Sequence, residues 1–371
     1  ADRARRGARR RRQRALAAAA AACVALLVAA GLTYVVANHR PGPAATHRSS
    51  TARFRMPYGY QVSAVAVGGP YLYVLFDQAD VLAAYDRATG KLVRRVTLPD
   101  SPSGLTVGPG GLVWVPYDAA DDGAPYGLWL LSPDLRLHTA MANVTLGAIV
   151  PVSRTTAWSP SQYGLYWLSL PAPGSAGQGT WRLQPNTSIG PPLNTAPGGA
   201  VLVGGNVVAE VTNGYGLHGH LVIAGQPSMT YGGGAQTSVW GVTAVGSSLW
   251  AIVGSDANNF GGGLVRLDSR LRATTPATVR RSQVLSQVAA VWSHGDTVWV
   301  ALGPESWEGG HSLACFRAGP RIGRVVSLPV TGQVVALAAA NGSVYVSASP
   351  AGQAAGQGIG ISSYRVPAAC R

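Results

Sequence analysis

The chain has 371 residues, of which 47% are hydrophobic and only 12% are charged, and it contains 48 glycines. This composition excludes a chain that is disordered throughout. The net charge of +14 is uneven, because residues 1–50 carry ten arginines and one acid (+9), which leaves +5 for residues 51–371. The basic charge therefore belongs mainly to a terminal tail, which argues against a nucleic-acid-binding surface.

The N-terminal region has the pattern of a membrane anchor. Eight arginines between Arg3 and Arg14 precede a run without charged side chains, residues 15–37, which as a helix would match a hydrocarbon core of about 30 Å. By the positive-inside rule we expect a cytoplasmic tail over residues 1–14 and a transmembrane signal anchor over residues 15–37. The domain after it is then extracytoplasmic, in a single-pass protein of the plasma membrane.

Two details of this region allow other interpretations. Val35-Val36-Ala37 resembles a signal-peptidase site, and cleavage there would release the domain from the membrane. Cys23 follows Ala21-Ala22 and in this resembles a lipoprotein cysteine, but most of the apolar run follows it instead of preceding it, so we interpret Cys23 as a residue of the helix. Residues 38–52 combine Pro, Gly, Ser and Thr, and they read as a flexible stalk before a domain at 53–371.

A repeated phrase follows, in which an aromatic or aliphatic anchor stands among apolar and small residues. Successive anchors are 41, 44, 50, 42, 49 and 46 residues apart, a period typical of propeller blades with four strands each. We predict an all-β fold, a seven-bladed β-propeller. The anchors are Tyr73, Trp114, Trp158, Val208, Trp250, Trp299 and Tyr345. Their fixed place in the second strand favours packing between blades over a carbohydrate or lipid site.

In blade one we expect strands at 63–67, 71–76, 81–86 and 92–98, and the later blades follow at 104–141, 146–183, 200–230, 239–279, 287–328 and 334–366. Blade seven ends after its third strand. Residues 52–57 have the shape of the missing strand, so we predict that they complete blade seven and close the ring.

Acidic residues gather in the loops between second and third strands, which open on one rim of a propeller. A rim of this kind would suit a cationic ligand or a divalent cation, although long polar loops also need solvated charges. The rim acids are Asp77, Asp80, Asp118, Asp121, Asp122, Asp256, Glu305 and Glu308.

Histidines accompany these acids in the same loops. His218 and His220 form one local pair, and Glu308 and His311 form another. Neither pair has the spacing of a known zinc signature, so surface histidines are the simpler interpretation. If a metal were bound, these four residues would be its candidate ligands, and Glu308 and His311 the candidate catalytic residues.

Two cysteines, Cys315 and Cys370, lie in the last two blades and would staple the C-terminal tail to the ring if they paired. The sequence leaves their pairing open, because a bridge needs Cα atoms less than about 7 Å apart.

Three segments carry a resemblance to a known family. They are SAVAVGGPYLYVLF, the segment YDRATGKLVRRVTLP that follows it, and VVALAAANGSVYVSA, and they resemble the blades of YVTN and NHL-type propellers. The resemblance covers residues 53–366 and implies a seven-bladed ring that often serves as a binding or scaffolding module. Streptogramin lyase shares this kind of scaffold, but its blade phrase of Trp-Phe-Thr-Glu type is missing here, since Trp114 precedes Val115-Pro116. No catalytic residue is therefore carried over.

From these features we expect a membrane-anchored extracytoplasmic propeller that binds a protein, a glycan or a small ligand on its acid-rich rim, without a cofactor. The alternative is a metal-assisted lyase or hydrolase of the streptogramin-lyase type, with one divalent cation. The first interpretation makes the chain a binding protein and not an enzyme, and the sequence leaves the choice between the two open.

Overall fold

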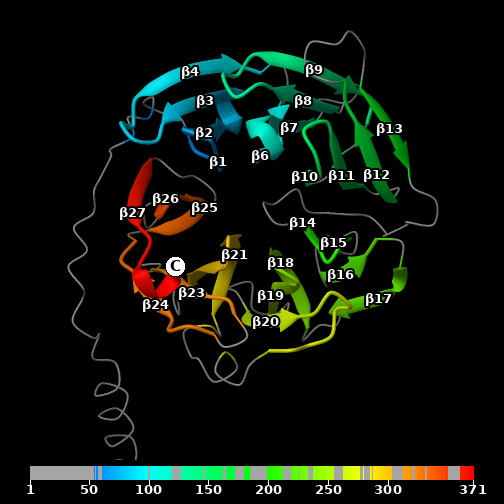
Figure 1. Cartoon of the computed structure of the whole chain (residues 1–371), viewed down its shortest axis with the longest axis vertical. Coiled ribbons are helices and arrows are strands. Elements are labelled where there is room, and N and C mark those ends of the chain that lie inside the picture. The colour runs from blue at the N-terminus through cyan, green and yellow to red at the C-terminus, as the bar shows by residue number, and fades with distance from the viewer. Residues whose placement is uncertain are drawn as a thin grey trace, which may run out of the picture. The chain divides into compact units, whose positions relative to one another are not determined.

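A computed structural model describes residues 54, 56, 61–98, 101–118, 127–144, 146, 148–161, 164–171, 179–183, 199–211, 219–224, 226–232, 237–254, 262–275, 279, 285, 287–302, 312–319, 322–330, 332–349 and 360–371. Their strands form seven antiparallel sheets arranged as a ring, with the first strand of each sheet at the centre (Figure 1). The predicted seven-bladed β-propeller is confirmed.

The blades follow one another along the chain. Blade one is β1 (Ala64–Gly68), β2 (Tyr71–Phe76), β3 (Val81–Asp86) and β4 (Leu92–Thr97), with the 3-10 helix η1 (Asp77–Ala79) before β3. Blade two is β5 (Ser101–Pro102), β6 (Thr106–Val107), β7 (Val113–Asp118), β8 (Gly127–Leu131) and β9 (Leu137–Ala142), with η2 (Pro109–Gly111) before β7. Both β5 and β6 pair with β7, so this blade has a divided inner strand.

Blade three is β10 (Val150–Pro151), β11 (Thr156–Ser161), β12 (Gly164–Ser169) and β13 (Thr180–Leu183). Blade four is β14 (Ala200–Val203), β15 (Asn206–Val211), β16 (His220–Ile223) and β17 (Gln226–Gly232). Blade five is β18 (Ser238–Val245), β19 (Ser248–Gly254) and β20 (Gly263–Leu267).

Blade six is β21 (Val288–His294), β22 (Thr297–Leu302), β23 (Ser312–Arg317) and β24 (Val326–Leu328). Blade seven is β25 (Gln333–Ala340), β26 (Ser343–Ser349) and β27 (Ile361–Arg365), and η4 (Ala368–Cys370) follows it. Among the described residues, blades five and seven have three strands each. The other blades have four, if the divided inner strand of blade two is counted as one.

Blade one shows how the sequence sets the strands. Its turn between β3 and β4 is held by Asp86, whose Oδ1 accepts hydrogen bonds from the Thr89 backbone N–H (2.8 Å) and hydroxyl (2.7 Å). Gly90 completes the turn at φ +70°, a left-handed conformation that glycine adopts at little cost. The predicted bounds of β2 and β3 agree with the structure, whereas β1 is shifted by one residue at both ends and β4 ends one residue earlier than predicted.

Most of the repeated anchors pack between blades, as predicted. Tyr73, Trp114, Trp250 and Trp299 are fully buried. Tyr73 lies in one apolar cluster with Val113 and Val115 of the next blade, and its hydroxyl donates a 2.8 Å hydrogen bond to the carbonyl of Pro133 there. Each of these four anchors lies in a cluster with residues of the following blade and ties its own blade to it.

The interface between blades three and four is the exception. Trp158 is only half-buried and makes an edge contact with Trp167 of its own sheet, with ring centroids 4.4 Å apart. On the blade-four side of this interface, the apolar cluster consists of Ala209 and Val222, with Ala200 packed against it. Small side chains here bury less apolar surface than the aromatic anchors elsewhere, which matches the irregular sequence of these two blades.

The N-terminal segment contributes to the junction where the ring closes. Phe54 is 6% exposed, and its ring makes edge contacts with Tyr85 of blade one (6.0 Å) and Tyr345 of blade seven (5.7 Å). Met56 packs against the same cluster. The predicted pairing of residues 52–57 as a strand falls largely outside the described residues, but Phe54 itself lies between the first and last blades.

A disulfide joins Cys315 in β23 to Cys370 in η4, with Cα atoms 5.9 Å apart. It fixes the C-terminal tail to blade six, the arrangement that the sequence left open. Both cysteines are fully buried in the cluster that also contains Trp299 and Val366.

Residues 1–14, 15–37 and 38–52, which carry the predicted tail, membrane span and stalk, lie outside the described residues. Among the residues that are described, no helix is both long and apolar enough to cross a bilayer.

Candidate functional site in the central cavity

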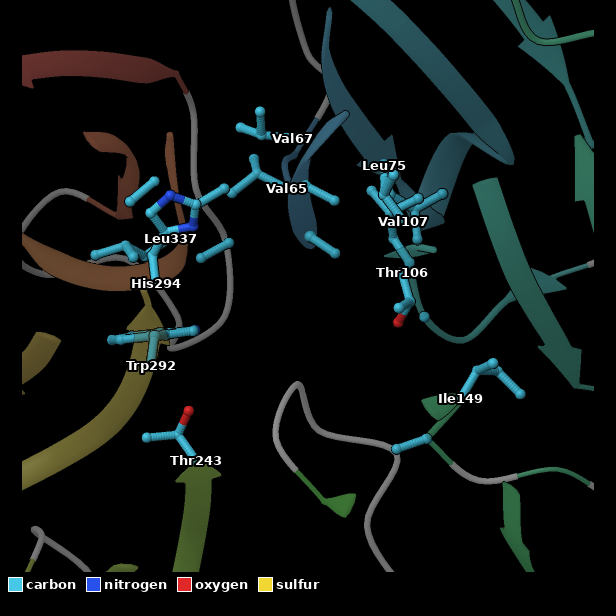
Figure 2. A pocket seen from close by; sticks show the side chains of 18 of the residues that line it. Val65, Val67, Leu75, Thr106, Val107, Ile149, Thr243, Trp292, His294 and Leu337 are labelled. Atoms are coloured by element: carbon cyan, nitrogen blue, oxygen red, sulfur yellow. The ribbon is translucent and has the colours of Figure 1, made fainter. Parts of the chain in front are cut away.

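A cavity of about 850 Å³ occupies the centre of the ring (Figure 2). Its wall includes residues of the first strand of each blade or directly beside it, so the site is built from residues far apart in the sequence. Its volume lies within the range of about 300 to 1,000 Å³ that is usual for small-molecule sites.

Most of the lining side chains are apolar and several are β-branched, while about half of the lining surface is polar. Figure 2 shows Val65, Val67 and Leu337 on one side and Val107 and Ile149 on the other. The apolar residues that line the cavity include Val65, Val67, Leu75, Val107, Ile149, Val201, Val242, Val291, Trp292 and Leu337.

A hydroxyl pair interrupts this apolar wall. Thr243 Oγ1 and Ser293 Oγ are 2.7 Å apart, and Ser293 donates to the carbonyl of Ala244 at 2.8 Å. Because the Ser293 proton is used in that bond, Thr243 is the donor to Ser293. The lone pairs of Thr243 remain available as acceptors for a bound molecule.

The titratable side chains among the described lining residues are Asp77, Arg87 and His294. The register of blade one separates Asp77 from Arg87. Phe76 pairs with Val81 beside the η1 loop of Asp77, while Tyr71 pairs with Asp86 beside Arg87, at the other end of the same strands. The cavity therefore has an acid near one end and a cation near the other.

His294 lies at the end of β21 and is one of the residues that line the cavity (Figure 2). Burial, and to a smaller extent the positive charge of Arg87, holds the pKa of His294 below its usual value. His294 is therefore neutral at pH 7, and Arg87 is the cation of this end.

The structure describes only part of the acidic rim that the sequence predicts. The Asp77 Oδ1 accepts a hydrogen bond from the Gln78 backbone N–H (2.8 Å), and Asp80 caps η1 in a left-handed conformation at φ +50°. Asp118 ends β7, where it pairs with Ser101. The other rim acids, Asp121, Asp122, Asp256, Glu305 and Glu308, lie outside the described residues.

Of the candidate metal ligands, too, the structure describes only a part. His220 begins β16 and is half-buried between Val211 and Gly232, while His218, Glu308 and His311 lie outside the described residues. Among the residues with a described placement, no three His, Cys, Asp or Glu side chains are grouped in a way that could hold a metal ion.

No family model and no curated protein matches the sequence. Solved structures do match the fold. Streptogramin B lyase aligns at 12% identity with a TM-score of 0.52, over 85% of this chain and 97% of that one. The scaffold is similar to that of streptogramin B lyase.

Two further structures resemble the chain to the same degree. The virginiamycin B lyase of Staphylococcus aureus has 10% identity and a TM-score of 0.54, over 83% of this chain and 96% of its own. The hydrazine synthase of Kuenenia stuttgartiensis has 10% identity and a TM-score of 0.55, over 85% and 98% of the two chains. At these identities the likeness to streptogramin B lyase and the others concerns the fold, because one propeller scaffold serves many activities.

The amino-acid sequence alone did not predict the central cavity as a binding site. Arg87 stands in a turn phrase, Asp-Arg-Ala-Thr-Gly, that the turn alone explains, and His294 ends a strand of ordinary apolar character. No spacing in the sequence relates these two residues, which are 207 positions apart (294 minus 87). One signal was present in the sequence: an inner strand ends in a titratable residue, His294.

Proposed function

We propose that the chain is a binding protein whose central cavity takes up a small molecule with both an apolar and a polar part. The observation that carries this proposal is the cavity of about 850 Å³, which is lined mostly by apolar side chains from all seven blades and presents polar groups over about half of its surface. Large apolar pockets with a few convergent polar groups are the usual form of small-molecule sites.

The composition of the wall supports this choice over the acidic rim alone. Trp292 and Leu337 offer an aromatic and an aliphatic surface, and Thr243 offers an acceptor for orientation. Asp77 belongs both to the rim and to the cavity lining, so a ligand that enters from the rim would pass it.

A neutral fluorescent probe, N-phenyl-1-naphthylamine, tests this function. We expect saturable binding of about one probe per chain, with enhanced probe fluorescence. Thr106 is half-buried on the cavity wall (Figure 2), so Thr106→Trp should project a bulky ring into the cavity and weaken probe binding at least tenfold.

The matched control is Thr97→Trp, which adds the same side chain at an exposed position on the outer strand β4. It should leave probe binding unchanged. Absence of saturable binding, or equal binding by both variants and the wild-type chain, would overturn the proposal.

We also propose that residues 15–37 anchor the propeller to a membrane, with the basic segment on the cytoplasmic side. The support is the uncharged run after eight arginines. In isolated membranes the full chain should resist carbonate extraction. In intact cells an externally added protease should degrade the propeller. Recovery of a chain that lacks residues 1–37 from the medium would instead indicate a cleaved signal peptide.

A further inference from the structure

The guanidinium of Arg87 has an unused hydrogen-bond donor at the cavity. Its Nε atom is buried and has no hydrogen-bond partner among the described residues, and none of the ion pairs recorded among them includes Arg87. A buried donor without a partner costs about 1 to 3 kcal/mol, and more when it is charged, so an acceptor at this point would be favourable.

The neighbouring groups do not supply that acceptor. Asp86 is adjacent in sequence, but its Oδ1 is occupied by Thr89, and hydrogen bonds from Thr89 are the main reason for its lowered pKa, with Arg87 the smallest contributor. Burial raises the pKa of Tyr345 and lowers that of His294, and the positive charge of Arg87 acts to lower both, but both side chains are neutral at pH 7 and offer no negative charge to Arg87. The other acid of the lining, Asp77, is at the opposite end of blade one.

The backbone holds Arg87 in place independently of its side chain. The Arg87 N–H donates a 3.0 Å hydrogen bond to the carbonyl of Pro70, in the turn between β1 and β2. The cation is thus presented to the cavity by a fixed turn, and substitution of the side chain leaves the hydrogen bonds of this turn intact.

We infer that the cavity selects an elongated apolar molecule with a single carboxylate, which pairs with the guanidinium of Arg87 while the apolar part lies along the inner strands. The inference rests on the proposed function and specifies its ligand class. A guanidinium binds a carboxylate through two parallel hydrogen bonds, which a neutral alcohol cannot reproduce.

Orientation follows from the charges at the two ends of blade one. A carboxylate near Asp77 would meet a like charge, whereas one near Arg87 meets its counter-ion. The five residues of β1, at about 3.4 Å each, extend over roughly 17 Å, which exceeds the length of an extended chain of ten carbons.

Displacement of N-phenyl-1-naphthylamine by decanoate and by 1-decanol tests the inference. In the wild-type chain decanoate should bind at least tenfold more tightly than 1-decanol. Arg87→Gln should remove that difference while probe and decanol binding stay within twofold, and Arg87→Lys should keep part of it. The control Arg95→Gln, on the exposed face of β4, should behave as wild type.

The two proposals fail in different ways. If the neutral probe does not bind, the proposed function is wrong. If the probe binds but decanoate is no tighter than 1-decanol, or Arg87→Gln leaves the preference for decanoate intact, the carboxylate inference is wrong and the binding function stands. Equal weakening of the probe, decanoate and 1-decanol in Arg87→Gln, with normal binding in Arg95→Gln, also contradicts a role specific to the carboxylate.

Discussion

Cys315 and Cys370 are bonded across 55 positions of sequence and connect the third strand of blade six to the last turn of the chain. Closing a loop of this length lowers the conformational entropy of the unfolded chain, which stabilises the folded state by about 4 kcal/mol on the chain-entropy model. The C-terminal end of the ring is therefore held covalently, while Phe54 holds the N-terminal end by packing.

Removal of the disulfide should lower stability without abolishing the fold. For Cys315→Ala/Cys370→Ala we expect a loss of about 2 to 4 kcal/mol in the free energy of unfolding, measured by denaturant titration. A reductant should lower the melting temperature of the wild-type protein but not that of the double variant. Equal sensitivity of both proteins to reductant would contradict the expected role of this bond.

Phe54 should act as the clasp of the ring. Phe54→Ala removes a buried aromatic ring from the junction of blades one and seven, and we expect a loss of about 3 to 5 kcal/mol. Thermal unfolding of Leu137→Ala, a truncation at a position that is 62% exposed, provides the comparison and should be nearly unchanged. If both variants melt at the same temperature as the wild-type protein, Phe54 does not close the ring.

The hydroxyl of Tyr73 should stabilise the junction of blades one and two. Tyr73→Phe keeps the buried ring and removes the 2.8 Å hydrogen bond to Pro133, so a loss of about 1 kcal/mol is expected. Tyr71→Phe, a hydroxyl deletion two residues away on the same strand, should cost less than half as much. Denaturant unfolding of the two variants decides, and a reversed order would refute this assignment.

Glu210 should make the protein less stable as the pH rises. Its side chain in β15 is 3% exposed, and burial raises the pKa of its carboxyl to about 7. Between the unfolded value near 4.5 and about 7 the folded state binds more protons than the unfolded state, so the free energy of unfolding falls with increasing pH over this window.

The variant Glu210→Gln isolates this effect. It should unfold like the wild-type protein at pH 4 and be more stable by about 3 kcal/mol at pH 8, because the amide carries no charge to bury. Denaturant titrations of both proteins at these two pH values measure the difference. A difference that does not change with pH would show that Glu210 does not titrate in this range.

The anchors show how far the sequence alone reaches. An aromatic or apolar residue that recurs every 41 to 50 positions predicted seven blades, and Tyr73, Trp114, Trp250 and Trp299 lie fully buried in second strands. The same pattern did not predict that Trp158 is only half-buried. Local spacing fixes a strand, but the facing blade decides how deeply its residues are buried.

The sequence by itself determined the repeat, the seven-bladed ring and the separation of a basic, apolar N-terminal region from a nearly neutral domain. Only the tertiary structure decided that Cys315 bonds to Cys370, that Phe54 sits between Tyr85 and Tyr345, and that Arg87 and His294 face one cavity. The physical reason is that blade formation depends on contacts between neighbouring strands, which a periodic sequence records. The cavity, in contrast, arises where seven distant strands meet, and no local pattern encodes that meeting.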